Sequence, residues 1–225
     1  MFDSVSLGDL TLNNRIGLAP MTRVSATDDG QATSRMAQYY TTFAKGGFSF
    51  LITEGVYTDS VYSKGYNKQP GLVTDDHVDA WTHVTDAVHD AGGVIFAQLM
   101  HCGAQNQGIP QESDQETIAP SAVKPDGEKN EAYGGNGPYP KPKEANKEDL
   151  ETARKGFVAA AINAHEAGFD GVEIHAANGY LLNEFLSDKM NRREDEYGGS
   201  PEARVQYPAE VVNSVVSAVP EEFIV

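Results

Sequence analysis

An imidazole, an amide and a phenol lie within a short stretch of the chain, at His175, Asn178 and Tyr180. The apolar run at residues 171–174 that precedes them has the composition of a buried strand, so the three side chains would gather at one strand end. Imidazole and phenol groups are common proton donors and acceptors in enzymes. This stretch is therefore predicted to form the chemical part of a functional site.

Other expected strands also end in polar or small residues. The first strand is followed by Pro20, Met21 and the hydroxyl of Thr22, and the second by the carboxyl of Glu54 and by Gly55. The third ends near the carboxamide of Gln98 and a second imidazole, His101. Glu173 and His175 share a strand face, but two ligands without a third at fixed spacing are weak evidence for a metal ion. We therefore expect no metal at this site. The set is better suited to a planar heteroaromatic ring.

The elements that would position these residues alternate along the chain. Strands are expected at Arg15–Ala19, Phe48–Thr53, Val94–Leu99 and Gly171–His175, with a fifth beginning at Phe223. Helices are expected between them, at Gln31–Ala44, Asp75–Ala91, about 147–167 and Pro201–Ala218. Residues Val5–Leu12 alternate around Gly8 and Asp9, which predicts an amino-terminal β-hairpin cap.

Near-continuous apolar strands that alternate with amphipathic helices indicate an α/β fold with a parallel sheet. A doubly wound sheet and a closed barrel share this pattern. The sequence has no G-x-G-x-x-G after its first strand, which favours the barrel. The chain is thus predicted to be a single (β/α)8 TIM-barrel domain over residues 1–225 that is incomplete, because only about five strands are present. The aperiodic stretch at about 100–145 is predicted to be a long active-site loop.

Composition excludes several other functions. The chain has 33 acidic and 17 basic residues and a net charge of −16, which disfavours binding to nucleic acid and to anionic membrane surfaces. No window approaches the length of a transmembrane helix, and the amino terminus lacks a secretion signal. The single cysteine, Cys102, excludes an internal disulfide and is expected to be a buried, inert thiol. We expect a cytoplasmic protein, and a homo-oligomer is possible.

Six segments, in order, resemble the Old Yellow Enzyme family of flavin-dependent ene-reductases. They are L-x-N-R-I-x-L-A-P-M-T at 12–22, L-I-T-E-G at 51–55, A-Q-L-M-H at 97–101, A-P-S-A at 119–122, H-A-A-N-G-Y-L-L-x-E-F-L-S at 175–187 and D-E-Y-G-G-S-P-E-x-R at 195–204. The resemblance covers almost the whole chain. It implies a (β/α)8 barrel that binds FMN, is reduced by NADPH or NADH, and reduces the C=C bond of a small activated alkene such as an α,β-unsaturated carbonyl compound.

The resemblance also implies a role for individual residues. Pro20, Met21 and Thr22 would lie along the flavin ring, with the Thr22 hydroxyl near its O4 and N5 edge. Gly55 would let the backbone approach the ring, and Gln98 would bind the pyrimidine N3 and O2. The remaining residues would bind the substrate carbonyl and transfer the proton. His175 and Asn178 would bind that carbonyl oxygen, and Tyr180 would give a proton to the α-carbon.

The chain is shorter than the barrel that the resemblance implies. The arginine that commonly follows the fifth strand and the phosphate-binding loops after strands seven and eight do not occur in these 225 residues. We therefore expect the isolated chain to bind FMN poorly or not at all, and co-purification of one flavin per chain would contradict this. Two alternatives stay open: a barrel fragment of a 2,4-dienoyl-CoA or enoate reductase, and a non-catalytic half-barrel remnant.

Overall fold

The computed structural model describes residues 1–108 and 117–225 and contains the expected parallel sheet. Its four strands are β3 (Gly17–Leu18), β4 (Phe50–Tyr57), β5 (Val94–Met100) and β8 (Gly171–Ile174), in the order β3-β4-β5-β8. All three neighbouring pairs are parallel. A parallel bridge from Gly171 to Ile224 adds the start of the fifth strand beside β8.

The first strand is shorter than expected and the second is longer. Only Gly17 and Leu18 of the expected range 15–19 pair with β4. The pairing of β4 with β5 continues to Tyr57 after an irregularity between Ile52 and Gly55. This irregularity lies at the carboxyl end of the apolar run, where the motif residues Glu54 and Gly55 begin, and the sequence pattern does not show it.

One face of the sheet packs against the helices, and the other carries the candidate site residues. Alternate residues of β5 belong to the core shared with the helices, namely Ile95, Ala97 and Leu99. The residues between them point to the opposite face, because side chains alternate along a strand. On that face Phe96 contacts Phe50 with ring centroids 6.3 Å apart, and Gln98 follows Phe96 toward the carboxyl end of the strand.

The helices are α1 (Ser34–Lys45), α2 (Asp75–His89), α3 (Lys147–Glu166) and α5 (Pro201–Ala218). Three of these helices, α2, α3 and α5, begin at the capping residues that the sequence pattern predicts. The side chains of Thr74, Asn146 and Ser200 each accept a backbone N–H of the first turn. The fourth, α1, starts at Ser34 instead of Gln31, because Thr33 is its capping residue. Trp81 of α2 is fully buried in the core.

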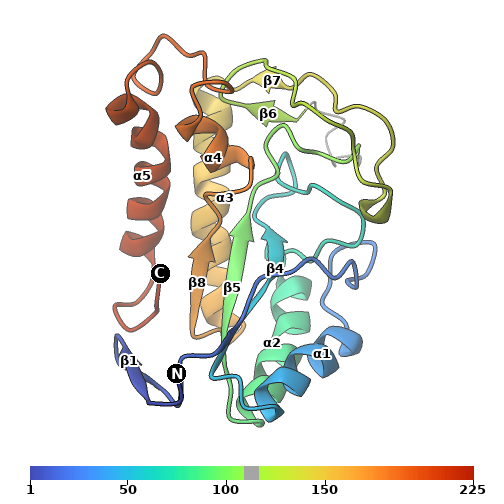
Figure 1. Ribbon diagram of the computed structural model, residues 1–225, viewed down its shortest axis with the longest axis vertical. Coiled ribbons are helices and arrows are strands. Elements are labelled where there is room, and N and C mark those ends of the chain that lie inside the picture. Colours follow the sequence, from blue (N-terminus) through green and yellow to red (C-terminus); the bar gives the residue numbers. More distant parts are fainter. Residues whose placement is uncertain (109–116) are drawn as a thin grey trace.

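The amino-terminal hairpin forms as predicted, with β1 (Val5–Leu7) antiparallel to β2 (Leu10–Leu12). Gly8 in its turn has a φ of 55°, in the region that favours glycine. The hairpin lies at the end from which the parallel strands start (Figure 1). A Cβ on Gly8 would lie 2.8 Å from the Ile224 side chain, so the turn packs tightly against the fifth-strand segment.

The loop at 100–145 contains short elements that the sequence did not predict. They are a parallel pair of β6 (Ile118–Ala119) with β7 (Lys143–Glu144) and a 3-10 helix, η1 (Glu131–Tyr133). A further short helix, α4 (Leu181–Leu186), follows β8. Figure 1 shows that these elements gather at the carboxyl end of the strands. Residues 109–116, also part of the predicted loop, lie outside the described residues. In the described part of the chain, no helix has both the length and the apolar character needed to cross a membrane.

Candidate active site

His175 and Tyr180 lie in contact at the carboxyl end of β8. Their rings pack edge to face, with centroids 5.0 Å apart and an interplanar angle of 71°. The backbone N–H of His175 donates to the carbonyl of Leu99 at 2.9 Å, which fixes this strand end against β5. The backbone N–H of Ala177 donates to Nδ1 of His175 at 3.4 Å. A neutral ring that accepts at Nδ1 carries its hydrogen on Nε2, so Nε2 is the donor.

Burial keeps the His175 imidazole and the Tyr180 phenol uncharged, so that each can donate a hydrogen bond. It lowers the pKa of His175, an effect that the charge of Glu173 partly opposes, so the imidazole is neutral at pH 7. Burial, with the nearby Tyr133, raises the pKa of Tyr180 to about 12. The phenol therefore keeps its proton throughout the physiological range and can donate it.

Gln98 lies on the neighbouring strand, on the same face as His175. It is paired in register with Glu173 of β8 and is 5% exposed. Its Nε2 donates to Oε1 of Glu173 at 2.7 Å. The sequence suggested Glu173 only as a weak metal ligand. The structure shows that its partner is the Gln98 amide.

Tyr66, a residue that sequence reasoning missed, lies beside Thr22 and Gly55. Its hydroxyl donates to the carbonyl of Gly55 at 3.1 Å, and the Thr22 side chain acts to lower the pKa of this hydroxyl against the larger, raising effect of burial. Tyr66 is buried, and its position in the loop after β4 gave no periodic signal. A Cβ on Gly55 would lie 2.5 Å from the Met100 sulfur, so a larger residue there would require the Met100 side chain to move. The expected approach of Gly55 to a flavin stays a prediction.

Aromatic side chains belong to a small, largely buried apolar cluster next to these groups. Tyr66 packs against Tyr133 of η1, with ring centroids 5.4 Å apart. Tyr180 packs on the same small cluster, which also contains Met100 and Cys102. The predicted long loop therefore contributes Tyr133 directly to this end of the sheet.

The other predicted residues, Asn178, Pro20 and Met21, are more exposed. Asn178 is in the turn between His175 and Tyr180, where its φ of 57° places it in the left-handed region that asparagine tolerates. Its carbonyl accepts a hydrogen bond from Gln105 Nε2 at 2.8 Å. Pro20 is half-buried at the end of β3, and Met21 is 60% exposed.

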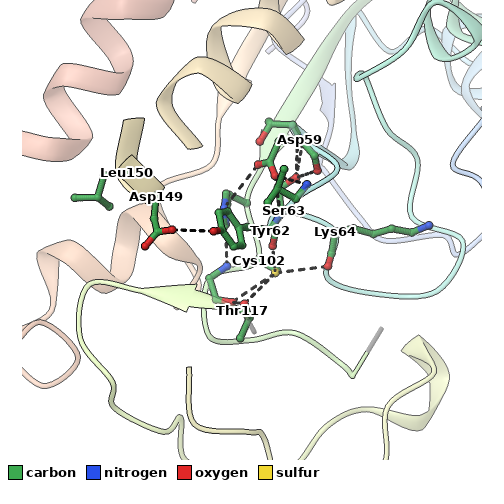
Figure 2. Close-up of polar contacts among 12 residues, drawn as sticks. Asp59, Tyr62, Ser63, Lys64, Cys102, Thr117, Asp149 and Leu150 are labelled. Carbon is green, nitrogen blue, oxygen red and sulfur yellow. Dashed lines mark hydrogen bonds and ion pairs between the residues drawn. The ribbon is translucent and has the colours of Figure 1, made fainter. Parts of the chain in front are cut away.

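A buried polar network anchors the loop that carries Tyr66 (Figure 2). Asp59 accepts the backbone N–H groups of Val61 and Tyr62, which closes a turn after β4. The Tyr62 hydroxyl donates to Asp149 of α3 at 2.7 Å. On the other side, the Cys102 sulfur lies 3.3 Å from the Tyr62 carbonyl. Burial raises the pKa of this thiol well above its ordinary value, so Cys102 is the inert thiol that was expected.

Two further buried groups lie behind the site. His101 is 1% exposed; its Nδ1 accepts the N–H of Gly103, and its Nε2 lies 3.8 Å from Oδ2 of Asp59. Glu184 of α4 accepts the N–H of Ala104 at 2.8 Å, and burial raises its pKa well above the ordinary value. These contacts tie α4 to the loop after β5. They place His101, whose role the sequence left open, in the interior.

The outer helices form a separate groove. It has a volume of about 560 Å³ and lies between α3 and α5, lined by Arg154, Val158, Ile162 and Asn213 among others. None of the predicted site residues lines it. In residues 1–108 and 117–225, no group of three or more His, Cys, Asp or Glu side chains is arranged to hold a metal ion.

Curated relatives are similar to the chain over nearly its whole length. The chain is 40% identical over 228 residues to a protein of Leishmania infantum named as a probable flavin mononucleotide-dependent alkene reductase, covering 99% of this chain and 61% of the relative. It is 38% identical over 222 residues to 12-oxophytodienoate reductase 7 of Oryza sativa subsp. japonica, covering 97% of this chain and 55% of the relative. The chain thus spans little more than half of these relatives.

Solved structures show the same fold. An Old Yellow Enzyme homologue from Zymomonas mobilis superposes with a TM-score of 0.90 at 38% identity, covering 99% of this chain and 61% of that structure. Morphinone reductase in complex with tetrahydroNAD gives a TM-score of 0.90 at 35% identity, with 99% and 62% coverage. The expected α/β barrel architecture, present here in part, is confirmed.

The family model that matches describes the NADH:flavin oxidoreductase / NADH oxidase family, and the match extends over residues 1–225. Together with the structural likeness to an Old Yellow Enzyme homologue, this match confirms the family that the sequence motifs indicated. The chain belongs to the NADH:flavin oxidoreductase / NADH oxidase family.

Proposed function

We propose that the protein is an FMN-dependent oxidoreductase that uses NADH or NADPH to reduce the C=C bond of an α,β-unsaturated carbonyl compound or a related activated alkene. The observation that carries this proposal is the packed pair of His175 and Tyr180 on the same strand end and face as Gln98. One ring is a neutral donor at Nε2 and the other a protonated phenol. The pair can polarise a carbonyl group and protonate a carbon nearby.

The residues present fit the flavin. Gln98 has a carboxamide with both donor and acceptor atoms, as a pyrimidine edge requires. The hydroxyls of Thr22 and Tyr66 lie in the loops after β3 and β4, where they could reach a second polar edge. Tyr66, Tyr133 and Met100 form an apolar cluster beside these polar groups, as a site for a flat ring requires. We propose that Pro20, Met21, Thr22, Gly55 and Gln98 hold FMN, which would supply hydride chemistry when bound.

The chain's own residues would carry the remaining chemistry. Nε2 of His175, with the Asn178 side chain, would donate to the substrate carbonyl oxygen and stabilise the negative charge that develops there. The Tyr180 hydroxyl would hold the proton that the α-carbon takes up. The reductant and the alkene would use one pocket in turn, which predicts ping-pong kinetics. The proposed partner is thus a small molecule, and the proposed location is the cytoplasm, where Cys102 would stay reduced.

The proton-donor role can be tested in the intact enzyme by separating the two half-reactions. Tyr180→Phe should slow reoxidation of the reduced enzyme by an alkene by about 10²-fold or more, because it removes the transferable proton. Reduction of the flavin by NADPH or NADH should change little. Stopped-flow absorbance at the flavin band measures both steps. Tyr133→Phe is the matched control, since it removes a neighbouring phenol without the proposed role. Equal losses in both half-reactions would refute the assignment.

A further inference from the structure

We propose that Glu173 is a positioning residue that fixes the orientation of the Gln98 carboxamide for the pyrimidine edge of the flavin. This inference rests on the proposed FMN site. It assigns a role to a carboxylate that touches neither the proposed substrate nor the flavin, and that acts through its neighbour.

The geometry of the two strands places the side chains in direct contact. Gln98 and Glu173 are register partners in the parallel pair of β5 and β8, so their side chains stand side by side on the face opposite the helices. The Gln98 backbone N–H is held by Thr53 Oγ1 at 3.1 Å, which secures β5 from its other neighbour as well. The contact from Gln98 Nε2 to Glu173 Oε1 is 2.7 Å, the length of a charge-assisted hydrogen bond.

The chemistry of the pair allows only one orientation of the amide. A carboxylate accepts hydrogen bonds and donates none, so it must face the NH2 end of Gln98. A rotated amide would place its carbonyl oxygen against the Glu173 carboxylate at hydrogen-bond distance, which is repulsive. The bond to Glu173 uses one of the two Nε2 hydrogens. It leaves one N–H donor and the Oε1 acceptor for other partners, which are the groups that a pyrimidine O2 and N3–H require.

Glu173 also affects a residue of its own strand, His175. His175 is two residues further on the same face, and the Glu173 charge raises its pKa against the larger effect of burial. The imidazole still accepts at Nδ1 from the backbone. Of these contacts, the Gln98 amide is the one whose orientation depends on the carboxylate.

The experiment compares Glu173→Gln with wild type in the intact barrel, because the isolated chain is expected to bind FMN poorly or not at all, and it uses FMN alone as the probe. The variant keeps the size of the side chain but can face the Gln98 amide with either a donor or an acceptor, so both amide orientations become accessible. FMN affinity of the apoprotein is measured by quenching of flavin fluorescence. The side-chain NH2 signals of Gln98, assigned by their loss in Gln98→Leu, are followed by ¹⁵N NMR without flavin. Glu166→Gln, on the exposed end of α3, is the matched control.

The expected result is a loss of FMN affinity of about tenfold in Glu173→Gln, together with a shift of the Gln98 NH2 signals, and neither change in Glu166→Gln. Glu173→Ala should give the same loss, and urea unfolding should show both variants folded. FMN affinity within twofold of wild type, or unmoved Gln98 signals, would overturn the inference. A wild-type protein that binds no FMN while its Gln98 signals still depend on Glu173 would instead overturn the proposed flavin site, and with it the role given to Glu173.

Discussion

Glu54 places a carboxyl group in the interior, against the loop that carries Thr22. It is fully buried, and its Oε2 accepts the backbone N–H of Arg23 at 2.9 Å. The next residue, Val24, has a φ of 50°, which is costly for a β-branched side chain. The loop after β3 is therefore strained and is held by this carboxyl. Burial raises the pKa of Glu54 to about 7.

This pKa predicts how stability depends on pH. The folded state holds the Glu54 proton more tightly than the unfolded state, in which the pKa has its ordinary value of 4.5. Stability from this group is therefore greatest below pH 4.5 and falls as the pH rises toward 7, by about 3 kcal/mol. Glu54→Gln cannot ionise and should lack this loss.

Urea unfolding of wild type and Glu54→Gln at pH 5 and pH 8 measures the effect. The difference in unfolding free energy between the two proteins should change with pH in favour of the variant, and subtraction removes the contributions of other groups such as Glu184. The exposed Glu166→Gln should leave the pH dependence unaltered. A pH-independent difference for Glu54→Gln would show that the carboxyl titrates normally.

The candidate site residues differ in how far sequence could predict them. His175, Tyr180 and Gln98 could be placed together from sequence, because parallel strands bring their carboxyl ends to one edge. Tyr66 could not, since its place depends on the turn closed by Asp59. The link between Gln98 and Glu173 depends on strand register, which no local pattern specifies.

Among the secondary-structure elements, β8 pairs along its free edge with the fifth-strand segment at Ile224, and the two backbones lie very close together. The N–H of Val172 donates to the Ile224 carbonyl at 2.8 Å. A Cβ on Gly171 would lie 2.4 Å from that same carbonyl oxygen, and backbone cannot yield as a flexible side chain can. Glycine at this position thus permits the strand to add.

Gly171→Ala should separate these two segments and destabilise the fold by roughly 1–3 kcal/mol, the usual cost of overpacking. Urea unfolding measures the loss, and amide hydrogen exchange at Val172 should become faster. Gly46→Ala is the matched control. Its φ is −76°, and an added Cβ would come no closer than 3.3 Å to its neighbours. Unchanged exchange at Val172 in Gly171→Ala would contradict the predicted separation.

Long elements were predictable and short ones were not. The helices and central strands carry enough residues for a repeating apolar pattern, and the capping residues Thr74, Asn146 and Ser200 set where helices begin. The pair β6–β7 and the helices η1 and α4 span two to six residues each, which is too short for any period to show. They form through contacts with distant residues, such as the bond from Asn67 N–H to the Tyr133 carbonyl.

For the whole molecule, the dominant electrostatic feature is its excess of acidic residues. The net charge of −16 creates repulsion that opposes the compact state. Exposed ion pairs such as Lys147–Glu196, whose atoms are 2.8 Å apart, offset part of it locally. Salt screens both effects, so its influence on stability shows which of them is larger.

We expect repulsion to be larger, so the urea midpoint should rise between low salt and about 0.5 M sodium chloride. Two variants separate the contributions, because each breaks the Lys147–Glu196 pair while shifting the net charge in opposite directions. Lys147→Gln removes one positive charge, which makes the net charge more negative by one, and should steepen the dependence on salt. Glu196→Gln removes one and should give a shallower dependence than Lys147→Gln. Equal slopes would mean that the local pair governs the response, and a midpoint that falls with salt would mean that ion pairs outweigh the repulsion of the acidic surface.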